Sequence, residues 1–193
     1  MDRLHPIIHA AGAEERLPGW AVASPARRRH ARRVGGLLGE WADALEHDAT
    51  TRIRWRAAGL LHDALKDEAV EVLRPLVHGA EEWPGPLLHG PACANRLRAS
   101  GVDDEPLLRA IASHTTGHPD LGALGRALYM ADFLEPGRPA SGPERAGLRR
   151  RMPEDWHAVL AEVATARIGS LIDRKIPVSS ATAGFWRVVT APR

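Results

Sequence analysis

The sequence has very few of the residues that crosslink a chain or anchor it in a membrane. Its single cysteine, Cys93, excludes an internal disulfide and a metal site built from several thiolates, and is typical of a reducing compartment. No apolar run approaches the roughly 18 residues that a membrane-spanning helix requires. Histidine and proline interrupt residues 4–11, so a signal peptide is not indicated either. We therefore expect a cytoplasmic protein with no membrane partner.

Lysine, aromatic residues and net charge are also scarce. The 26 Lys and Arg residues face 24 Asp and Glu residues, which leaves a formal net charge of +2. Lysine occurs at Lys66 and Lys175, and tyrosine and phenylalanine together make three residues. A nucleic-acid surface combines excess positive charge with aromatic side chains that stack on bases. Because the excess of positive charge is slim and no aromatic stacking patch is visible, we do not expect a nucleic-acid partner.

The apolar residues follow a helical period. Residues such as Val34, Leu37, Leu38 and Trp41 recur at spacings of three and four, and no strand-like alternation or repeat is visible. The sequence therefore predicts an all-α protein, with residues 1–24 as an N-terminal extension holding at most one short helix, and residues 25–193 as one domain. The expected helices are residues 25–46, 50–63, 67–78, 87–101, 103–117, 121–134, 153–172 and 182–188.

His62 and Asp63 stand at the polar end of the apolar run 57–61. Burying either side chain without a partner costs several kcal/mol, and a cation is the usual compensation. On a helix the two residues diverge by about 100°. They can therefore hold an ion in the wedge between them, provided that other helices complete the coordination shell.

Other histidines and acids also fall at helix ends beside apolar runs. Each histidine alone is more often a satisfied core residue than a ligand. Together they come from five helical segments and can meet only if the helices pack around a common centre. Nitrogen and oxygen ligands without thiolate suit iron or manganese better than structural zinc. The candidates are His30, His62, Asp63, His89, His114 and Asp132.

Four segments carry a resemblance to a known family. They are Gly-Leu-Leu-His-Asp at 59–63, Leu-His-Gly-Pro at 88–91, His-Thr-Thr-Gly at 114–117 and Tyr-Met-Ala-Asp-Phe-Leu-Glu-Pro-Gly-Arg at 129–138. With His30 and Lys66, this ordered set resembles the HD-domain metal-dependent phosphohydrolases. In finer detail it is similar to their YqeK-type branch, the symmetrical bis(5′-nucleosyl)-tetraphosphatases, which split diadenosine tetraphosphate into two ADP. The resemblance covers roughly residues 25–180 and implies an HD-domain helical bundle around a central metal site.

The resemblance also implies residue roles. His30, His62, Asp63 and Asp132 would bind a core iron, and His89 and His114 would supply a second metal or contact the substrate phosphates. The implied cofactor is a divalent transition metal, iron in a mono- or dinuclear site, with manganese as the alternative. Asp63 is the natural bridging carboxylate. The residues expected to act in catalysis are Asp63, Lys66, His89 and His114.

Two cations are expected to contact phosphate. Lys66 follows Asp63 by three residues, so it lies on the same helical face and reaches the same pocket; a surface lysine is the alternative. Arg138 lies beyond a Pro-Gly turn, where the family has an arginine that can bind phosphate through two nitrogens.

The sequence signal for the remaining expected substrate contacts is weaker. Thr115 could donate its hydroxyl to a phosphate, beside His89 and His114. Arg27 fits a substrate position of the family, although residues 27–29 are a charge run and a solvated face is the alternative. Residues 176–186 loosely resemble the family segment that closes over a nucleoside.

The leading hypothesis is metal-dependent hydrolysis of a phosphoanhydride in a dinucleoside polyphosphate, with diadenosine tetraphosphate as the expected substrate. One alternative is another HD-type phosphohydrolase or phosphodiesterase that acts on mononucleotides or cyclic nucleotides. A different class is a non-catalytic nucleotide- or metal-binding regulator, or a basic helical protein that contacts RNA. The sequence leaves open whether the chain forms a homodimer.

Overall fold

The structure, a computed structural model, describes residues 4–137 and 143–192. Within those residues all regular structure is helical, which confirms the all-α prediction. The α-helices are α1 (Pro6–Glu14), α2 (Pro25–Ala44), α3 (Ala49–Leu61), α4 (Val70–Leu73), α5 (His89–Ala99), α6 (Glu105–Ser113), α7 (Ala123–Leu134), α8 (Pro143–Arg150), α9 (Trp156–Asp173) and α10 (Ser180–Thr190). Three short 3-10 turns lie between α4 and α5: η1 (Arg74–Leu76), η2 (Ala80–Glu82) and η3 (Gly85–Leu87).

Several helices begin at polar caps that the sequence displays. Ser24 and Asp48 accept hydrogen bonds from the backbone N–H groups three residues further on, at the starts of α2 and α3. Asp104 and Ser179 do the same for α6 and α10. A cap satisfies one of the four N–H groups that the first helical turn leaves without a partner.

Two predictions about helices were wrong. The helix expected over 67–78 is instead the four-residue α4 followed by η1, because Pro75 has no N–H to continue an α-helix. Asp67, expected at its start, accepts the backbone N–H of Ser24 at 2.7 Å. Helix α8 was not predicted, and the loop expected before Pro143 lies mostly at residues 138–142, outside the described residues.

Other boundaries differ by a few residues. Helix α2 ends at Ala44 rather than Glu46, α9 begins at Trp156 rather than Pro153, and α10 extends beyond the expected 182–188 at both ends.

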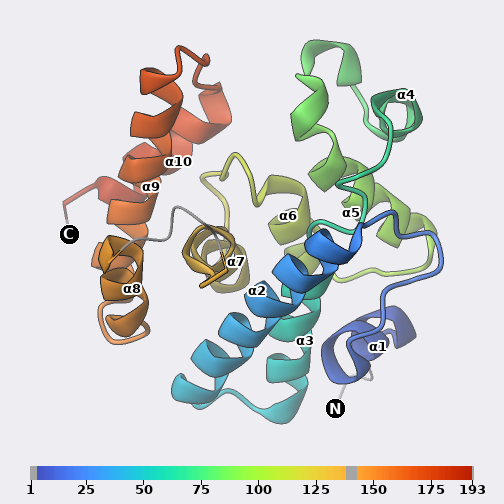
Figure 1. Cartoon of the computed structure of the whole chain (residues 1–193), viewed down its shortest axis with the longest axis horizontal. Helices are drawn as coiled ribbons and strands as arrows, with labels where there is room; N and C mark the ends of the chain where they lie inside the picture. Colours follow the sequence, from blue (N-terminus) through green and yellow to red (C-terminus); the bar gives the residue numbers. More distant parts are fainter. Residues whose placement is uncertain (1–3, 138–142, 193) are drawn as a thin grey trace.

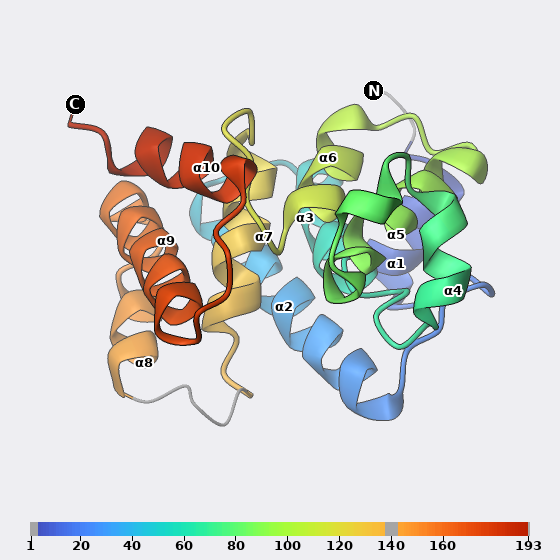
Figure 2. The same cartoon turned by 90° about the horizontal axis from the view of Figure 1, so that it is seen from above.

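Helix α7 lies between two groups of helices (Figure 1, Figure 2). On one side are α8, α9 and α10, and on the other are α1 to α6. The residues of α7 from Ala127 to Leu134 are buried apart from Phe133, so this helix is packed on nearly all sides. A helix that is apolar around most of its circumference has to be central.

The N-terminal helix α1 packs on the same core. Ile8 and Ala11 are buried in it, and a Cβ placed on Gly12 would lie 2.0 Å from the backbone oxygen of Ile53 on α3. Helix α1 is therefore in direct contact with α3, the helix that leads into His62.

No described helix combines the length and the apolar character that crossing a membrane requires.

Helices α2 and α3 approach each other so closely that only glycine fits at their crossing. A Cβ on Gly59 would lie 2.5 Å from the Cα of Gly35 and 2.6 Å from its nitrogen. The glycine of α3 therefore fixes the distance between the helix that carries His30 and the helix that ends at His62.

We expect Gly59→Ala to lower the free energy of unfolding by roughly 1–3 kcal/mol, the usual cost of overpacking. Gly36→Ala is the matched control, since a Cβ there meets nothing within 4 Å. Because alanine favours helix over glycine, the control should raise stability by up to about 1 kcal/mol. Urea unfolding of both variants measures the difference, and equal stabilities would contradict the proposed close crossing.

Candidate metal centre

Two of the candidate histidines stand at helix C-termini and use the helix to orient their rings. His62 is the C-terminal cap residue of α3, and its Nδ1 lies 2.7 Å from the carbonyl oxygen of Gly59. His114 caps α6 in the same way, with Nδ1 2.7 Å from the oxygen of Ile111. The last carbonyls of a helix lack intrahelical donors, so the ring N–H fills that position. Each Nε2 is thereby directed beyond its helix end.

The other two histidines are oriented by similar contacts. His89 Nδ1 is 2.9 Å from the oxygen of Pro86, and His30 Nδ1 is 3.1 Å from Oε1 of Glu135. A histidine that binds a metal usually donates its other ring N–H to a carbonyl or carboxylate. All four rings meet this requirement.

The carboxylate of Asp63 lies between the histidines. Its Oδ2 is 3.8 Å from His30 Nε2 and 3.5 Å from His62 Nε2. Its Oδ1 is 3.2 Å from His89 Nε2 and 3.5 Å from His114 Nε2. One carboxylate therefore faces two histidine pairs, one with each oxygen, which is the arrangement of a bridging ligand.

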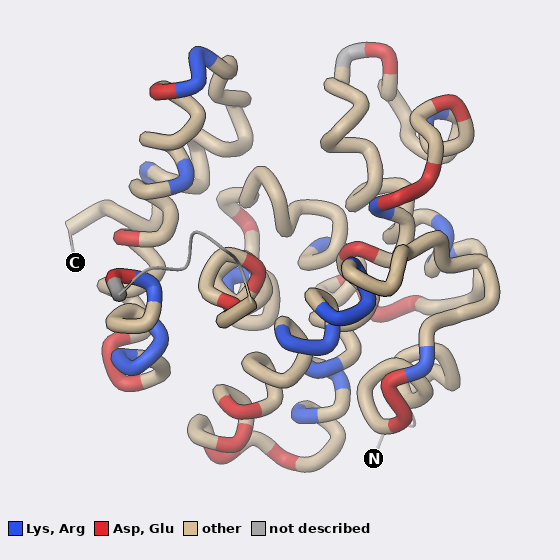
Figure 3. Tube along the Cα trace, viewed as in Figure 1, with Lys and Arg blue, Asp and Glu red and all other residues tan. Residues whose placement is uncertain are grey.

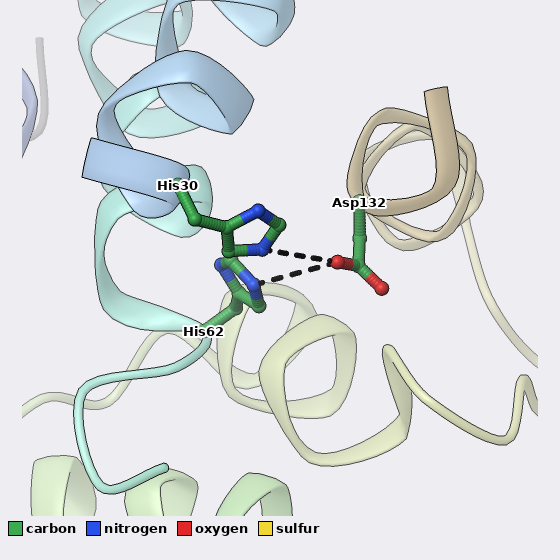
Figure 4. Close-up of side chains that lie close together, drawn as sticks. All are labelled: His30, His62 and Asp132. Atoms are coloured by element: carbon green, nitrogen blue, oxygen red, sulfur yellow. Dashed lines mark ion pairs between the residues drawn. The ribbon is translucent and has the colours of Figure 1, made fainter. Parts of the chain in front are cut away.

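Asp132 enters from α7 and completes the first of these groups (Figure 4). Its Oδ1 lies 3.2 Å from His30 Nε2 and 3.9 Å from His62 Nε2. The two Nε2 atoms are buried and make no hydrogen bond within the described residues. A buried polar nitrogen without a partner costs free energy, and a cation held by both nitrogens and the Asp132 carboxylate would remove that cost.

The geometry therefore fits a metal ion. The ligand atoms of His30, His62 and Asp132 lie within 4.8 Å of one another, and so do those of His62, Asp63 and His114. The two groups share His62, and all five residues are buried. The donor set is imidazole nitrogen and carboxylate oxygen, which suits a first-row divalent transition metal.

The protonation states of His62 and Asp63 favour ligation at neutral pH. Burial lowers the pKa of His62 to about 4, so this ring is neutral. Burial raises the pKa of Asp63, but the electrostatic interaction with the neighbouring His62 ring and hydrogen bonds with His114 and His89 outweigh it, and the pKa lies well below its usual value. A metal requires this combination of neutral imidazole and ionised carboxylate.

His30 responds to the acids around it. Burial opposes a charge on this ring, yet the carboxylates of Asp132 and Glu135 raise its pKa above the usual value. The electrostatic field of Asp132 and Glu135 therefore favours positive charge at His30. A metal ion bound beside His30 would also compensate these two carboxylates.

The site prediction missed Glu135 and Arg33. Glu135 is 1% exposed, holds His30 with one oxygen, and accepts from Arg33 Nε and from the Gly137 N–H at 2.7 Å with the other. Burial opposes the charge of Glu135, but these bonds lower its pKa to about 2. Arg33 follows His30 by three residues and Glu135 follows Asp132 by three, so the spacing of one helical turn was an available signal.

Arg167 was also missed. It reaches from α9 to Asp132 Oδ2 at 3.1 Å and to the backbone oxygen of Tyr129 at 2.9 Å, and its guanidinium lies over the Tyr129 ring. No local pattern links positions 132 and 167, so the sequence offered no signal for this contact.

The predicted substrate residues surround the centre where the structure describes them. Lys66 Nζ is 3.2 Å from His89 Nδ1 and 3.4 Å from the oxygen of Pro86. Thr115 Oγ1 is 3.0 Å from His114 Nε2. Arg138 lies outside the described residues.

Arg27 belongs to a run of arginines along α2 that lies close to acids (Figure 3). Arg28 and Arg29 are exposed, as a solvated charge run would be. Arg27 instead turns inward, with Nη1 3.1 Å from Asp63 Oδ2 and Nε 3.7 Å from Asp67 Oδ1. The structure thus places Arg27 at the centre, while a substrate contact stays a prediction.

The fold and the site together define a helical protein that encloses a histidine- and carboxylate-lined metal centre. A family model described as the HD domain matches residues 27–141, more than half of the chain. The chain therefore belongs to the HD-domain family of metal-dependent phosphohydrolases, as the sequence motifs indicated.

Individual proteins within the family are also similar to this chain. The chain is 31% identical over 137 residues to the symmetrical bis(5′-nucleosyl)-tetraphosphatase of Staphylococcus aureus, covering 67% of this chain and 66% of that protein. It is 30% identical over 129 residues to the protein of the same name from Bacillus subtilis, covering 63% and 68%. The alignments thus span about two thirds of the relatives' length.

A solved structure extends the likeness over more of the chain. The crystal structure of a predicted HD superfamily hydrolase involved in NAD metabolism from Clostridium acetobutylicum superposes with a TM-score of 0.74 at 28% identity. It covers 86% of this chain and 89% of that one. The helical arrangement around the centre is therefore shared well beyond the residues of the family match.

We expect His62→Ala to lower metal affinity by more than about 100-fold, above the 10–100-fold typical of residues that only support a ligand. Added Mn²⁺ should raise the thermal midpoint of the metal-stripped wild type, because a ligand bound by the folded state stabilises it. His62→Ala should show no such rise. The exposed His9→Ala is the control and should behave as wild type; a midpoint rise in His62→Ala equal to wild type would refute the site.

Glu135→Gln tests the support of His30. The substitution removes the negative charge facing the ring and one acceptor of Arg33, so we expect metal affinity to fall by about 10–100-fold while the fold is kept. Competition with a chromophoric chelator measures affinity, and circular dichroism checks folding. Wild-type affinity in the folded variant would contradict a supporting role for Glu135.

Proposed function

We propose that the chain hydrolyses a phosphoanhydride bond of dinucleoside tetraphosphates, converting diadenosine tetraphosphate into two ADP. The observation that carries this proposal is the buried Asp63 carboxylate, which faces one histidine pair with each oxygen in a chain of the HD-domain family. The substrate class comes from the relatives that share the name symmetrical bis(5′-nucleosyl)-tetraphosphatase.

The chemistry follows from the residues around the centre. His30, His62, Asp63 and Asp132 would hold one divalent metal, and His89 and His114 a second metal or the substrate phosphates. Ions held there would supply positive charge to the phosphoryl oxygens and acidify the water that attacks phosphorus. Iron is the first candidate from the nitrogen and oxygen ligand set, and manganese is the alternative.

Cationic and hydroxyl side chains bind the polyphosphate beside the metals. Lys66 has moderate exposure and stands at the His89 end of the centre, where its ammonium can neutralise charge that develops on a phosphate. Thr115 and Arg27 flank the same space, from the α6 side and from α2. Arg138 is proposed from the family motif alone.

Other nucleotide substrates are a second possibility within the same family. HD-type hydrolysis of mononucleotides or cyclic nucleotides would use the same metal centre, so the centre by itself does not determine substrate specificity. Parallel assays on diadenosine tetraphosphate, AMP and cyclic dinucleotides decide the matter. We expect ADP as the product of the first and turnover at least about tenfold slower on the others; preference for AMP or a cyclic dinucleotide would overturn the substrate proposal.

We expect Lys66→Ala to reduce kcat/KM by roughly 10–100-fold, the loss of about one charge-assisted phosphate contact. Metal content should stay near wild type, because the ammonium is not a ligand. Lys175→Ala, which removes the exposed lysine at the end of α9, is the matched control and should leave kcat/KM unchanged. Metal loss in Lys66→Ala would show that the residue supports the centre rather than the substrate.

A further inference from the structure

The packed face of α9 carries an arginine. Leu160 and Val163 are buried on this helix, and Arg167 follows them by seven and four residues, which places it on the same face. Its side chain is 18% exposed. Arginine is seldom buried to this extent unless its charge is paired. Because α9 lies beside α7 (Figure 2), the guanidinium has to find its partners on that helix.

Three groups of α7 receive the guanidinium of Arg167. Nη1 donates to the backbone oxygen of Tyr129 at 2.9 Å, and Nη2 donates to Oδ2 of Asp132 at 3.1 Å. Cζ lies 4.3 Å from the centre of the Tyr129 ring, whose face attracts a cation. Two donor nitrogens and a ring contact together fix the guanidinium in one position, which a single charge on a flexible chain would not achieve.

Two further arginines bind the same end of α7. Arg145 donates to the backbone oxygen of Phe133 at 3.3 Å, and Arg149 donates to that of Leu134. The last carbonyls of a helix lack intrahelical donors and form the negative end of its dipole, so cations are favourable there. Helices α8 and α9 thus hold the C-terminal end of α7, although both lie outside the segment that the family model matches.

The two oxygens of the Asp132 carboxylate have different surroundings. Oδ1 lies 3.2 Å from His30 Nε2 and 3.9 Å from His62 Nε2, whereas Arg167 binds Oδ2. Figure 4 shows that the second oxygen points away from both histidines. The torsion that turns a carboxylate about its last carbon–carbon bond is broad and has little preference of its own. A contact that fixes Oδ2 therefore also fixes the direction of Oδ1.

We infer that Arg167 is a positioning residue of the metal centre: by holding Oδ2 of Asp132, it keeps Oδ1 directed at an ion bound by His30 and His62. The inference rests on the metal ligands assigned under the proposed function. In this role Arg167 contacts neither the ion nor the substrate. A carboxylate held in this way is ordered before metal arrives, so binding does not have to order it.

The first measurement is the Mn²⁺ affinity of the metal-stripped protein, by competition with a chromophoric chelator. Arg167→Met removes the guanidinium and should lower the affinity by about 10–100-fold. Arg167→Lys can still donate to Asp132 but lacks the second arm that binds the Tyr129 carbonyl, so it should lose about 2–10-fold. Arg174→Met is the control and should match wild type, because Arg174 is exposed and donates to the Ser170 carbonyl of its own helix.

A double-mutant cycle shows whether Arg167 acts through Asp132. Asp132→Ala should lower Mn²⁺ affinity by about 100-fold or more, as the loss of a ligand. Adding Arg167→Met to Asp132→Ala should lower it no further, because no carboxylate remains to be directed. If the two losses add, Arg167 does not act through Asp132 and the inference is overturned.

A purely structural role of Arg167 gives a different result. Weaker packing of α9 on α7 would lower the thermal midpoint of the metal-stripped protein and leave the Mn²⁺ affinity of the folded protein unchanged. Wild-type affinity in Arg167→Met, with folding checked by circular dichroism, would therefore overturn the inference. Should Arg167→Met fail to fold, Arg167→Lys takes its place in the cycle, and the absence of any loss in that variant would count equally against the inference.

The inference and the proposed function fail in different ways. If Asp132→Ala keeps wild-type Mn²⁺ affinity, the ligand assignment under the proposed function is wrong. If Asp132→Ala loses metal but Arg167→Met does not, the ligand assignment stands and the role of Arg167 is wrong. If wild type binds Mn²⁺ through Asp132 and Arg167 but does not hydrolyse diadenosine tetraphosphate, the positioning role stands and the proposed substrate is wrong.

Discussion

A carboxylate removed from water needs positive charge close to it, and Asp63 is 4% exposed at the centre of this fold. Its two oxygens face four imidazole nitrogens that come from α2, from the end of α3, from the start of α5 and from the end of α6. Asp132 adds a second acid from α7. A cation bound among these two buried acids and four histidines would stabilise them further, and the helices are arranged so that the six side chains meet.

The orientation of the histidines is achieved largely by the backbone. Helix ends leave carbonyl groups without donors, and His62 and His114 satisfy those carbonyls while they direct Nε2 toward Asp63. His30 lies within a helix and has no free carbonyl available, so a side chain has to take that role. Glu135 supplies it, and Arg33 in turn holds Glu135. The position of each histidine in its helix thus explains whether its support is a peptide group or a carboxylate.

The metal centre and the cleft lined by Trp83, Leu87 and Thr116 differ in character. Around Asp63 the groups are charged and buried, which suits metal ions and phosphate. Around Trp83 they are apolar and partly exposed. Because the turn after His114 borders both regions, Gly117 and its contact with Phe185 fix their relative position.

The sequence by itself determined the helical class, the main helix starts and the set of buried histidines and acids. Capping residues and the three- and four-residue apolar period act locally, and the ordered motifs from His62 to Asp132 identified the family. Only the tertiary structure decided which atoms meet. The contact of Arg167 with Asp132, the close crossing of α2 and α3 at Gly59 and the packing of Phe185 on Tyr129 join residues that no local pattern connects. Such contacts depend on how whole helices pack, and packing is set by the shapes of many side chains at once rather than by the spacing of a few.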